Sequence, residues 1–593
     1  MRVFPRRFLV VLTVALSIVA LSWFMWPAAQ LAESTDLAAC RRKEHRTRIF
    51  RINADLKQTF IKKSAKISVH PRPIWLFSGF CDRLLGASAP SDIGSSHQDK
   101  SAVTAGDAQP SPASLTAMSS PAISEYLVAL RPTLAADVPQ MRDWPRYDLR
   151  LRIDPLTRQV LGTQQVIYTN RERSPMQDLA LRLYPNTEYM EGQMILGDVR
   201  VNQRVATTRF VVRNGRIDRS MVLLRLPSSL APGAQLTLTL ALTVTAPLSP
   251  TNGYRTLGLI DEMLSLPNAY AMIALREKGK WRLDSTPTFG DVVLSEMALY
   301  RARIELPKNY TLVATGVCQP DGDAQMCISG PARDFAMHVS TQYRVRSAML
   351  RDGTDGDITI YSYYLPEHER TGMRALDYAA TALKTYERRF GTYPYRELKI
   401  FETATIAGGI EYPMLAGVSS VNYEFEGGYF EWLIAHEIAH QWWYNMVGSN
   451  PMTEAWLDEA LTQYSASLYI EDRYGDAIAR TQRSLFFSER YDQERKAKGD
   501  RRVGQPSEAF PRWSYFPIVY GKGPLFFEQV RRNGGDARFE AWLRTYFAQN
   551  RYGIARANDL LKAATDVGLG DIARVAYEQW IVGRTSGSGK VTS

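Results

Sequence analysis

Two histidines four residues apart, with a glutamate directly after the first, are the side chains of this chain best suited to chemistry. They stand in His436-Glu437-Ile438-Ala439-His440, inside a segment that we predict to be a helix over 429–447, ended by Gly448. Histidines at i and i+4 project from one helix face, so both imidazoles can bind one metal ion. Glu437 is rotated by about 100° and reaches a water on that metal instead. The pattern predicts a zinc hydrolase site.

A catalytic zinc takes three protein ligands and keeps one open position, so the site needs a third ligand. Glu459 follows His440 after eighteen residues, on a second predicted helix over 454–474 that ends before Gly475. The intervening segment Gly448-Ser449-Asn450-Pro451 allows the chain to reverse. Two antiparallel helices would bring Glu459 to the face that carries His436 and His440.

The elements around these helices divide the chain into two folded parts. From about 146 to 346, apolar and polar residues alternate between turn signals, as in Leu236, Leu238, Leu240, Leu242 and Val244, which predicts an antiparallel β domain. After residue 370 the period becomes helical, with a helix expected over 373–389 and a short strand over 397–402. We therefore expect a multidomain α+β protein. His338 lies in an alternating segment of the β region and is interpreted as a packed strand residue.

The metal-site spacing and three further features carry a resemblance to a known family. The spacing from His436 to Glu459 resembles the aminopeptidase N-like family of gluzincin zinc peptidases, which includes the leukotriene hydrolases. The family's exopeptidase motif, Gly-x-Met-Glu-Asn, is similar to the segment around Glu411, and its Tyr-x-Lys-Gly motif is similar to the segment that begins at Tyr520. The end of its β domain resembles the region of Trp281, Gly290 and Asp291. In full, the matching segments are Gly408-Gly409-Ile410-Glu411-Tyr412-Pro413 and Tyr520-Gly521-Lys522-Gly523.

The resemblance implies a thermolysin-like, mostly helical zinc peptidase domain behind the β domain. It implies one Zn²⁺ held by His436, His440 and Glu459, with Glu437 as general base. Tyr520 would donate to the oxyanion, with Tyr515 as the competing candidate.

The resemblance also implies how a substrate is held. Glu411 would bind the α-amine of a peptide substrate within the motif formed by Gly408 and Gly409. The implied activity is removal of N-terminal residues from peptides.

Alternatives remain open at several of these positions. Glu411 is also consistent with a surface acid, and Tyr520 with core packing. The fold would also suit a zinc endopeptidase, another zinc hydrolase or a non-catalytic binding scaffold. Tyr412 and Tyr444 depart from the family's usual residues, as does Ala460. The chain resembles a bacterial-type short form without the family's long C-terminal helical domain, which predicts a more open cleft and leaves the oligomeric state undetermined.

The N-terminal region has the features of a membrane-targeting segment. An uncharged apolar run over 8–26, preceded by Arg2, Arg6 and Arg7, is long enough to span a bilayer. We expect a signal anchor or signal peptide over 1–27 and a basic juxtamembrane segment with an Ala-, Ser- and Pro-rich linker over 28–140. The β domain is then expected over 141–346, the catalytic domain over 347–585 and a flexible tail over 586–593.

Charge and cysteines bear on partners and location. Of the formal net charge of +11, the first 70 residues carry +9, from thirteen basic and four acidic residues. The folded body is therefore almost neutral, and we expect no nucleic-acid partner. The basic residues over 41–66 favour a cytoplasmic body, whereas Cys318 and Cys327 flank a turn and could form the disulfide of an exported protein. The alternative for these cysteines is two free thiols. We expect the catalytic domain to be extracytoplasmic.

Overall fold

The computed structural model describes residues 121–351, 355–425 and 427–584. The predicted apolar run over 8–26 and the basic segment over 41–66 lie outside these residues. Among the described helices, none combines the length and the apolar character that crossing a membrane requires.

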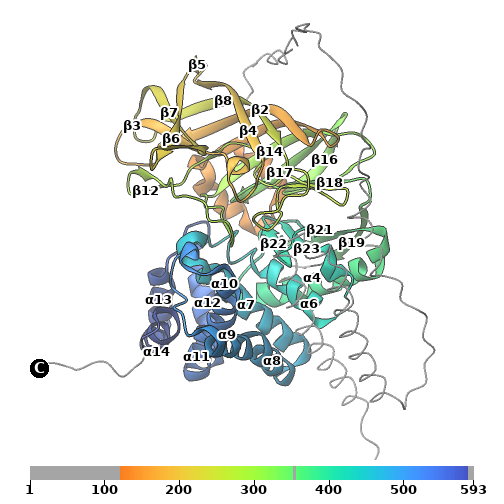
Figure 1. The fold of residues 1–593 in the computed structure, drawn as a ribbon, viewed down its shortest axis with the longest axis vertical. Coiled ribbons are helices and arrows are strands. Elements are labelled where there is room, and N and C mark those ends of the chain that lie inside the picture. Colours follow the sequence, from red (N-terminus) through yellow and green to blue (C-terminus); the bar gives the residue numbers. More distant parts are fainter. Residues whose placement is uncertain (1–120, 352–354, 426, 585–593) are drawn as a thin grey trace, which may run out of the picture. The chain divides into compact units, whose positions relative to one another are not determined.

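The first part of the described chain is dominated by strands, coloured orange to green in Figure 1. An eight-stranded sheet has the order β16-β17-β14-β1-β2-β8-β4-β5, and two four-stranded sheets have the orders β15-β18-β10-β9 and β11-β3-β7-β6. The pairs are antiparallel except β1 with β14. The strands are β1 (Arg146–Asp154), β2 (Gln159–Thr169), β3 (Met176–Arg182), β4 (Gln193–Val201), β5 (Arg204–Val205), β6 (Thr207–Arg213), β7 (Arg216–Leu230), β8 (Gln235–Thr245), β9 (Gly258–Ile260), β10 (Met263–Ser265), β11 (Met272–Ile273), β14 (Ala298–Glu305), β15 (Thr311–Ala314), β16 (Val317–Asp321), β17 (Ala324–Ala332) and β18 (Met337–Ser340), with a small pair β12 (Arg276–Glu277) and β13 (Lys280–Trp281).

The alternation of apolar and polar residues in the sequence matches the burial pattern of the central strands. In β8 the residues from Leu236 to Val244 alternate between buried and half-buried positions, because successive side chains of a strand point to opposite faces. In β18, His338 is buried, with its Nδ1 3.0 Å from Ser265 Oγ and its ring 4.2 Å from the ring of Phe401. The interpretation of His338 as a packed strand residue is confirmed.

The cysteines of the β domain are joined. β16 and β17 form an antiparallel hairpin in which Cys318 is the register partner of Cys327, and the two form a disulfide. The prediction of a hairpin that brings the two thiols together is confirmed.

The second part begins with a five-stranded mixed sheet of order β19-β20-β21-β23-β22 and continues as helices, coloured cyan to blue in Figure 1. β19 starts at Arg344, slightly before the predicted boundary at 346. The elements are β19 (Arg344–Leu350), β20 (Ile358–Tyr364), α4 (Glu369–Phe390), β21 (Glu397–Thr403), β22 (Gly409–Tyr412), β23 (Leu415–Ser419), α5 (Ser420–Tyr423), α6 (Gly428–Ala439), α7 (Pro451–Tyr474), α8 (Asp476–Arg483), α9 (Arg490–Lys498), α10 (Arg512–Phe516), α11 (Pro524–Gly534), α12 (Asp536–Asn550), α13 (Ala557–Asp566) and α14 (Gly570–Ala576), with π-helical turns η5 (Ser484–Glu489), η7 (Pro517–Lys522) and η8 (Tyr577–Val582).

Residues at the end of the predicted linker are folded. Two 3-10 helices, η1 (Ile123–Ala129) and η2 (Pro132–Asp143), precede β1 and bury Tyr126, Leu134 and Met141. Between them, Arg131 lies buried and donates to Glu387 and to the carbonyl oxygen of Tyr393. The linker predicted to run to residue 140 therefore cannot extend past residue 120. These helices lack the apolar periodicity that would have indicated them.

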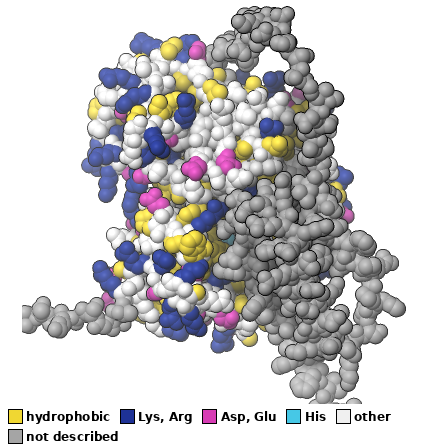
Figure 2. Space-filling model, viewed as in Figure 1, with side chains coloured by type: hydrophobic (Ala, Val, Ile, Leu, Met, Phe, Trp, Pro, Cys, Tyr) yellow, Lys and Arg dark blue, Asp and Glu magenta, His cyan; other side chains and the backbone are white. Residues whose placement is uncertain are grey.

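Lys and Arg side chains on the face shown in Figure 2 are interspersed with acidic and apolar ones. A body that carries little net charge is consistent with this distribution. The absence of a nucleic-acid partner stays a prediction.

Candidate active site

The helix that carries the paired histidines is shorter than predicted. α6 ends at Ala439 with His440 as its C-cap, not at residue 447. Beyond it the N–H groups of Asn445, Met446 and Val447 donate to carbonyl oxygens five residues earlier, and Tyr444 has φ 146°. The chain turns sharply there, but His440 keeps helical angles, so it still faces the same side as His436.

The second helix of the site ends at Tyr474 as predicted, and it begins at Pro451, three residues before the predicted start at 454. The side chain of Asn450 accepts from the N–H of Met452, Pro451 occupies the first turn, and Gly475 follows the last residue. α7 packs against α6, and α6 packs in turn on β22 and β23. This arrangement places Glu459 opposite the two histidines, as predicted.

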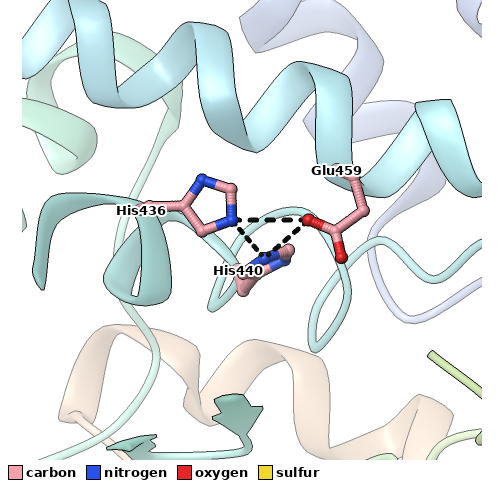
Figure 3. A group of neighbouring side chains, drawn as sticks. All are labelled: His436, His440 and Glu459. Carbon is pink, nitrogen blue, oxygen red and sulfur yellow. Dashed lines mark hydrogen bonds and ion pairs between the residues drawn. The ribbon is translucent and has the colours of Figure 1, made fainter. Parts of the chain in front are cut away.

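Three donor atoms converge between α6 and α7. The Nε2 atoms of His436 and His440 lie 3.2 Å apart, and Glu459 Oε2 lies 3.3 Å from the first and 3.5 Å from the second. Figure 3 shows the two imidazoles and the carboxylate pointing toward one another. All three side chains are buried.

These separations fit a zinc ion. Bonds of about 2.0–2.1 Å at tetrahedral angles place ligand atoms roughly 3.3 Å apart. Glu459 Oε2 is buried beside the two imidazole nitrogens, a position in which a carboxylate is stabilised by a cation. Burial opposes ionisation of Glu459, but hydrogen bonds from Asp291 and from the histidines hold its pKa well below its usual range. The donor set therefore suits Zn²⁺.

The orientation of His440 is fixed by groups on its other ring nitrogen. Its Nδ1 lies 2.8 Å from Asp458 Oδ1, 3.0 Å from the carbonyl oxygen of Trp443 and 3.3 Å from Thr462 Oγ1. These contacts leave Nε2 to point at the metal position, the usual arrangement for a metal-binding histidine. Sequence reasoning missed Asp458 in this role, although it directly precedes Glu459 in the chain.

Glu437 lies beside the donors, where β22 meets α6. Its carboxylate lies against the α-carbon of Gly409, because a Cβ built there would be 1.9 Å from Glu437 Oε1. Ligand atoms of Glu411, Glu437 and His440 lie within 4.8 Å of one another. Burial raises the pKa of Glu437 well above its usual range and that of Glu411 to about 8. Glu411 is buried, so the interpretation of it as a surface acid is wrong.

The glycine that precedes Gly409 has a backbone role. Gly408 has φ +95°, a left-handed conformation that side chains disfavour, and its carbonyl oxygen accepts from the N–H of Ser419. This conformation sets the start of β22 and therefore the position of Glu411.

The two candidate tyrosines occupy different places. The ring of Tyr520, on η7, is stacked on His436 at a centroid distance of 6.0 Å. Tyr515 packs instead against Phe289, at 5.4 Å, and against Gly290. Tyr520 is the one beside the metal donors, which favours it over Tyr515 as the oxyanion donor.

The β domain also contributes to the site. Asp291 lies next to Glu459, and burial together with the nearby carboxylates Glu411 and Glu459 raises its pKa well above its usual range. Arg333 donates to the carbonyl oxygens of Ser295, Tyr444, Met446 and Gly553, and so ties the β domain to the turn after α6. Local sequence patterns gave no signal for Arg333, because its partners are distant along the chain.

Comparison with known proteins agrees with this geometry. Residues 375–580 match the family model described as "Peptidase family M1 domain". The chain is 28% identical over 154 residues to Tricorn protease-interacting factor F2 of Thermoplasma acidophilum and 26% identical over 154 residues to aminopeptidase N of Lactobacillus delbrueckii subsp. lactis. Each match covers 25% of this chain but only 19% and 18% of the relatives' own lengths.

The fold is also found in solved structures. An M1 zinc metallopeptidase from Deinococcus radiodurans is similar with a TM-score of 0.55 and 18% identity, over 75% of this chain and 94% of that one. A variant of that protein bound to a Tyr-Ser-Ala substrate gives a TM-score of 0.53 at 17% identity, over 75% of this chain and 94% of that one. At such identities the likeness concerns the fold, a β-rich part followed by a helical part. Residues 375–580 thus match the peptidase family M1 domain, and the described chain is similar in its two-part fold to an M1 zinc metallopeptidase.

Proposed function

We propose that this protein is a zinc-dependent aminopeptidase that removes N-terminal residues from peptides. The observation that carries the proposal is the convergence of three buried donors from α6 and α7 with Glu437 directly beside them. The family match and the relative named aminopeptidase N support it.

Each side chain has a role in the proposed reaction. Zn²⁺ held by His436, His440 and Glu459 would supply Lewis-acid activation of water and of the scissile carbonyl. Glu437 takes the proton of the attacking water and passes it to the leaving amine as the C–N bond breaks. The hydroxyl of Tyr520 donates to the oxyanion that forms on the carbonyl.

Glu411 would restrict the enzyme to free N-termini. Its carboxylate is buried, with a ligand atom within 4.8 Å of those of Glu437 and His440, where it can pair with the α-ammonium group of a substrate. A buried ion pair of this kind stabilises the binding of substrates with a free amine, whereas a blocked substrate leaves the carboxylate without its partner.

The test combines zinc content with hydrolysis of aminoacyl-anilides and their N-acetylated forms. We expect about one zinc per chain and hydrolysis of the free forms only. Equal rates on acetylated substrates would favour the endopeptidase alternative, and bound zinc without any hydrolysis would favour the scaffold. Glu437→Gln serves as the control, because it should keep zinc and lose activity; retained activity in that variant would refute the mechanism.

We also propose an extracytoplasmic location, with the N-terminal apolar run as anchor or export signal. The disulfide between Cys318 and Cys327 supports it, because disulfides persist in oxidising compartments. Protease accessibility in intact cells tests it, and a body protected from added protease until lysis would contradict it.

A further inference from the structure

The strand that carries Glu411 is held against α6 and the turn after it at both of its ends. At the start of β22, the α-carbon of Gly409 contacts the carboxylate of Glu437. At its end, the backbone of Tyr412 is hydrogen-bonded to the side chain of Gln441, the residue directly after the second histidine of the site. β22 therefore runs beside the last turn of α6, and Glu411 lies between the two points of attachment.

The second attachment uses both ends of one buried amide group. Gln441 is completely buried, and its Oε1 accepts from the N–H of Met414 at 2.8 Å. Its Nε2 donates to the carbonyl oxygen of Tyr412 at 3.0 Å. These two backbone groups stand on either side of Pro413, in the loop that joins β22 to β23. A buried amide whose donor and acceptor are both used in this way fixes the backbone to which it is bonded.

The loop between β22 and β23 needs such support. It consists of Pro413 and Met414 alone, and Met414 has φ +62°, a left-handed conformation that is unfavourable for a residue with a side chain. Glycine, asparagine or aspartate is usual at such a position in a two-residue hairpin loop. A conformation of this kind persists where the surroundings hold it. Here they include Gln441 on the N–H of Met414 and the N–H of Lys399, which donates to the Met414 carbonyl oxygen at 2.9 Å.

We propose that Gln441 is a positioning residue for substrate selection, which holds the loop after Glu411 so that the Glu411 carboxylate faces the α-ammonium group of a substrate. Met414 lies only three residues beyond Glu411, so a change in the loop is transmitted along β22 to that carboxylate. Because Gln441 directly follows His440, the same side chain ties the amine position to the metal position. This inference rests on the proposed aminopeptidase function and adds the residue on which its selection of free N-termini depends.

Gln441→Met tests this role, because methionine has a similar length and volume but no amide donor or acceptor. kcat and KM are measured on aminoacyl-anilides with the zinc-loaded full chain. We expect KM to rise about tenfold, the effect of weakening one charge-assisted hydrogen bond to the substrate amine. Zinc content should be unchanged and kcat should stay within about threefold, because the lost interaction concerns binding. An unchanged KM would overturn the inference.

Gln164 provides the matched control. It is also completely buried, on β2 of the β domain, and its amide also forms both of its hydrogen bonds with the backbone. It accepts from the N–H of Ala271 at 2.9 Å and donates to the carbonyl oxygen of the same residue at 2.6 Å. Gln164→Met should therefore lower the urea midpoint about as much as Gln441→Met does, but leave KM unchanged. A similar rise of KM in both variants would assign the effect to a general loss of stability and contradict the positioning role.

A second variant keeps the test decisive if Gln441→Met does not fold. Gln441→Asn retains an amide group that is one methylene short of the loop, so the hydrogen bonds to Met414 and Tyr412 are weakened. We expect KM to rise by about threefold or more in this variant, with kcat and zinc content again close to those of the parent chain. A KM equal to that of the parent chain would count against the inference in the same way.

Binding separates this inference from the proposed function. If the parent chain hydrolyses no anilide, the proposed function fails, and calorimetry with leucinamide and N-acetyl-leucinamide still tests the position of Glu411. Tighter binding of leucinamide by the parent chain and by Gln164→Met, but not by Gln441→Met, supports the inference. The same preference in all three chains, or no preference in any of them, refutes it.

Discussion

The α-carbon of Gly409 and the carboxylate of Glu437 are in direct contact, so that any side chain at position 409 would occupy the place of that carboxylate. Gly409→Ala should therefore displace Glu437 while leaving the three zinc donors in place. A displacement of about 1 Å at a catalytic group can cost roughly 100-fold in rate. We expect kcat to fall by about that factor with zinc content unchanged, as measured by steady-state kinetics and metal analysis. Normal activity in this variant would show that Glu437 is not the base.

Asp458 should control zinc affinity without binding the metal itself. Asp458→Asn weakens the hold on His440 Nδ1, and loss of such a partner typically reduces metal affinity 10- to 100-fold. Competition with a chelator measures the change. The exposed Asp377 provides the control, since Asp377→Asn should not change zinc affinity; an unchanged affinity in Asp458→Asn would contradict the role.

Arg333 should stabilise the whole described fold. Arg333→Met removes the side-chain donor of the Ser295 and Tyr444 carbonyl oxygens and one of two donors to the carbonyl oxygens of Met446 and Gly553. We expect this loss to cost at least about 3 kcal/mol of unfolding free energy. Urea denaturation measures it, with Arg209→Met on the exposed surface of β6 as the comparison, where we expect a change below about 0.5 kcal/mol. Equal stability of the two variants would argue against this role of Arg333.

His338 should make the fold sensitive to acid. Burial lowers its pKa to about 3, so the unfolded chain binds a proton below pH 6.5 that the folded chain does not. Stability from this residue is complete above pH 6.5 and is lost as the pH falls toward 3, by about 1.4 kcal/mol per pH unit. Denaturation at pH 7 and pH 5 should show a smaller loss in His338→Gln than in the parent chain. Equal losses of unfolding free energy in the variant and the parent chain would mean that His338 does not contribute to the sensitivity to acid.

The helices with clear end signals were predictable from the sequence. α7 has Asn450 and Pro451 at its start and Gly475 at its end, and its bounds lie within three residues of the prediction. The end of α6 was not predictable, because residues 441–447 keep a helical composition although their hydrogen bonds run five residues back. Local propensity does not distinguish a helix from a turn that tertiary contacts stabilise, here those of Arg333 with Tyr444 and Met446.

The metal donors were predictable because the spacing of His436, His440 and Glu459 reports helix geometry directly. The groups around them were not, since Asp291 and Arg333 come from the β domain and reach the site only through the packing of the two parts. No short motif encodes such contacts. The segment over 121–143 was missed for a related reason: η2 contains Pro132 and Pro139 and shows no amphipathic period.

The burial of Arg131 limits where proteolytic maturation can take place. Its side chain faces Glu387 and the carbonyl oxygen of Tyr393, and the neighbouring Leu130 carbonyl accepts from Arg396. A cut after Arg131 that released the preceding segment would remove the cation that faces Glu387 and the Tyr393 carbonyl oxygen, and would take away the Leu130 carbonyl oxygen that accepts from Arg396. Processing that leaves the described fold intact must therefore cut upstream of Leu130, so that both residues stay attached to the domain whose charges and carbonyl groups they satisfy.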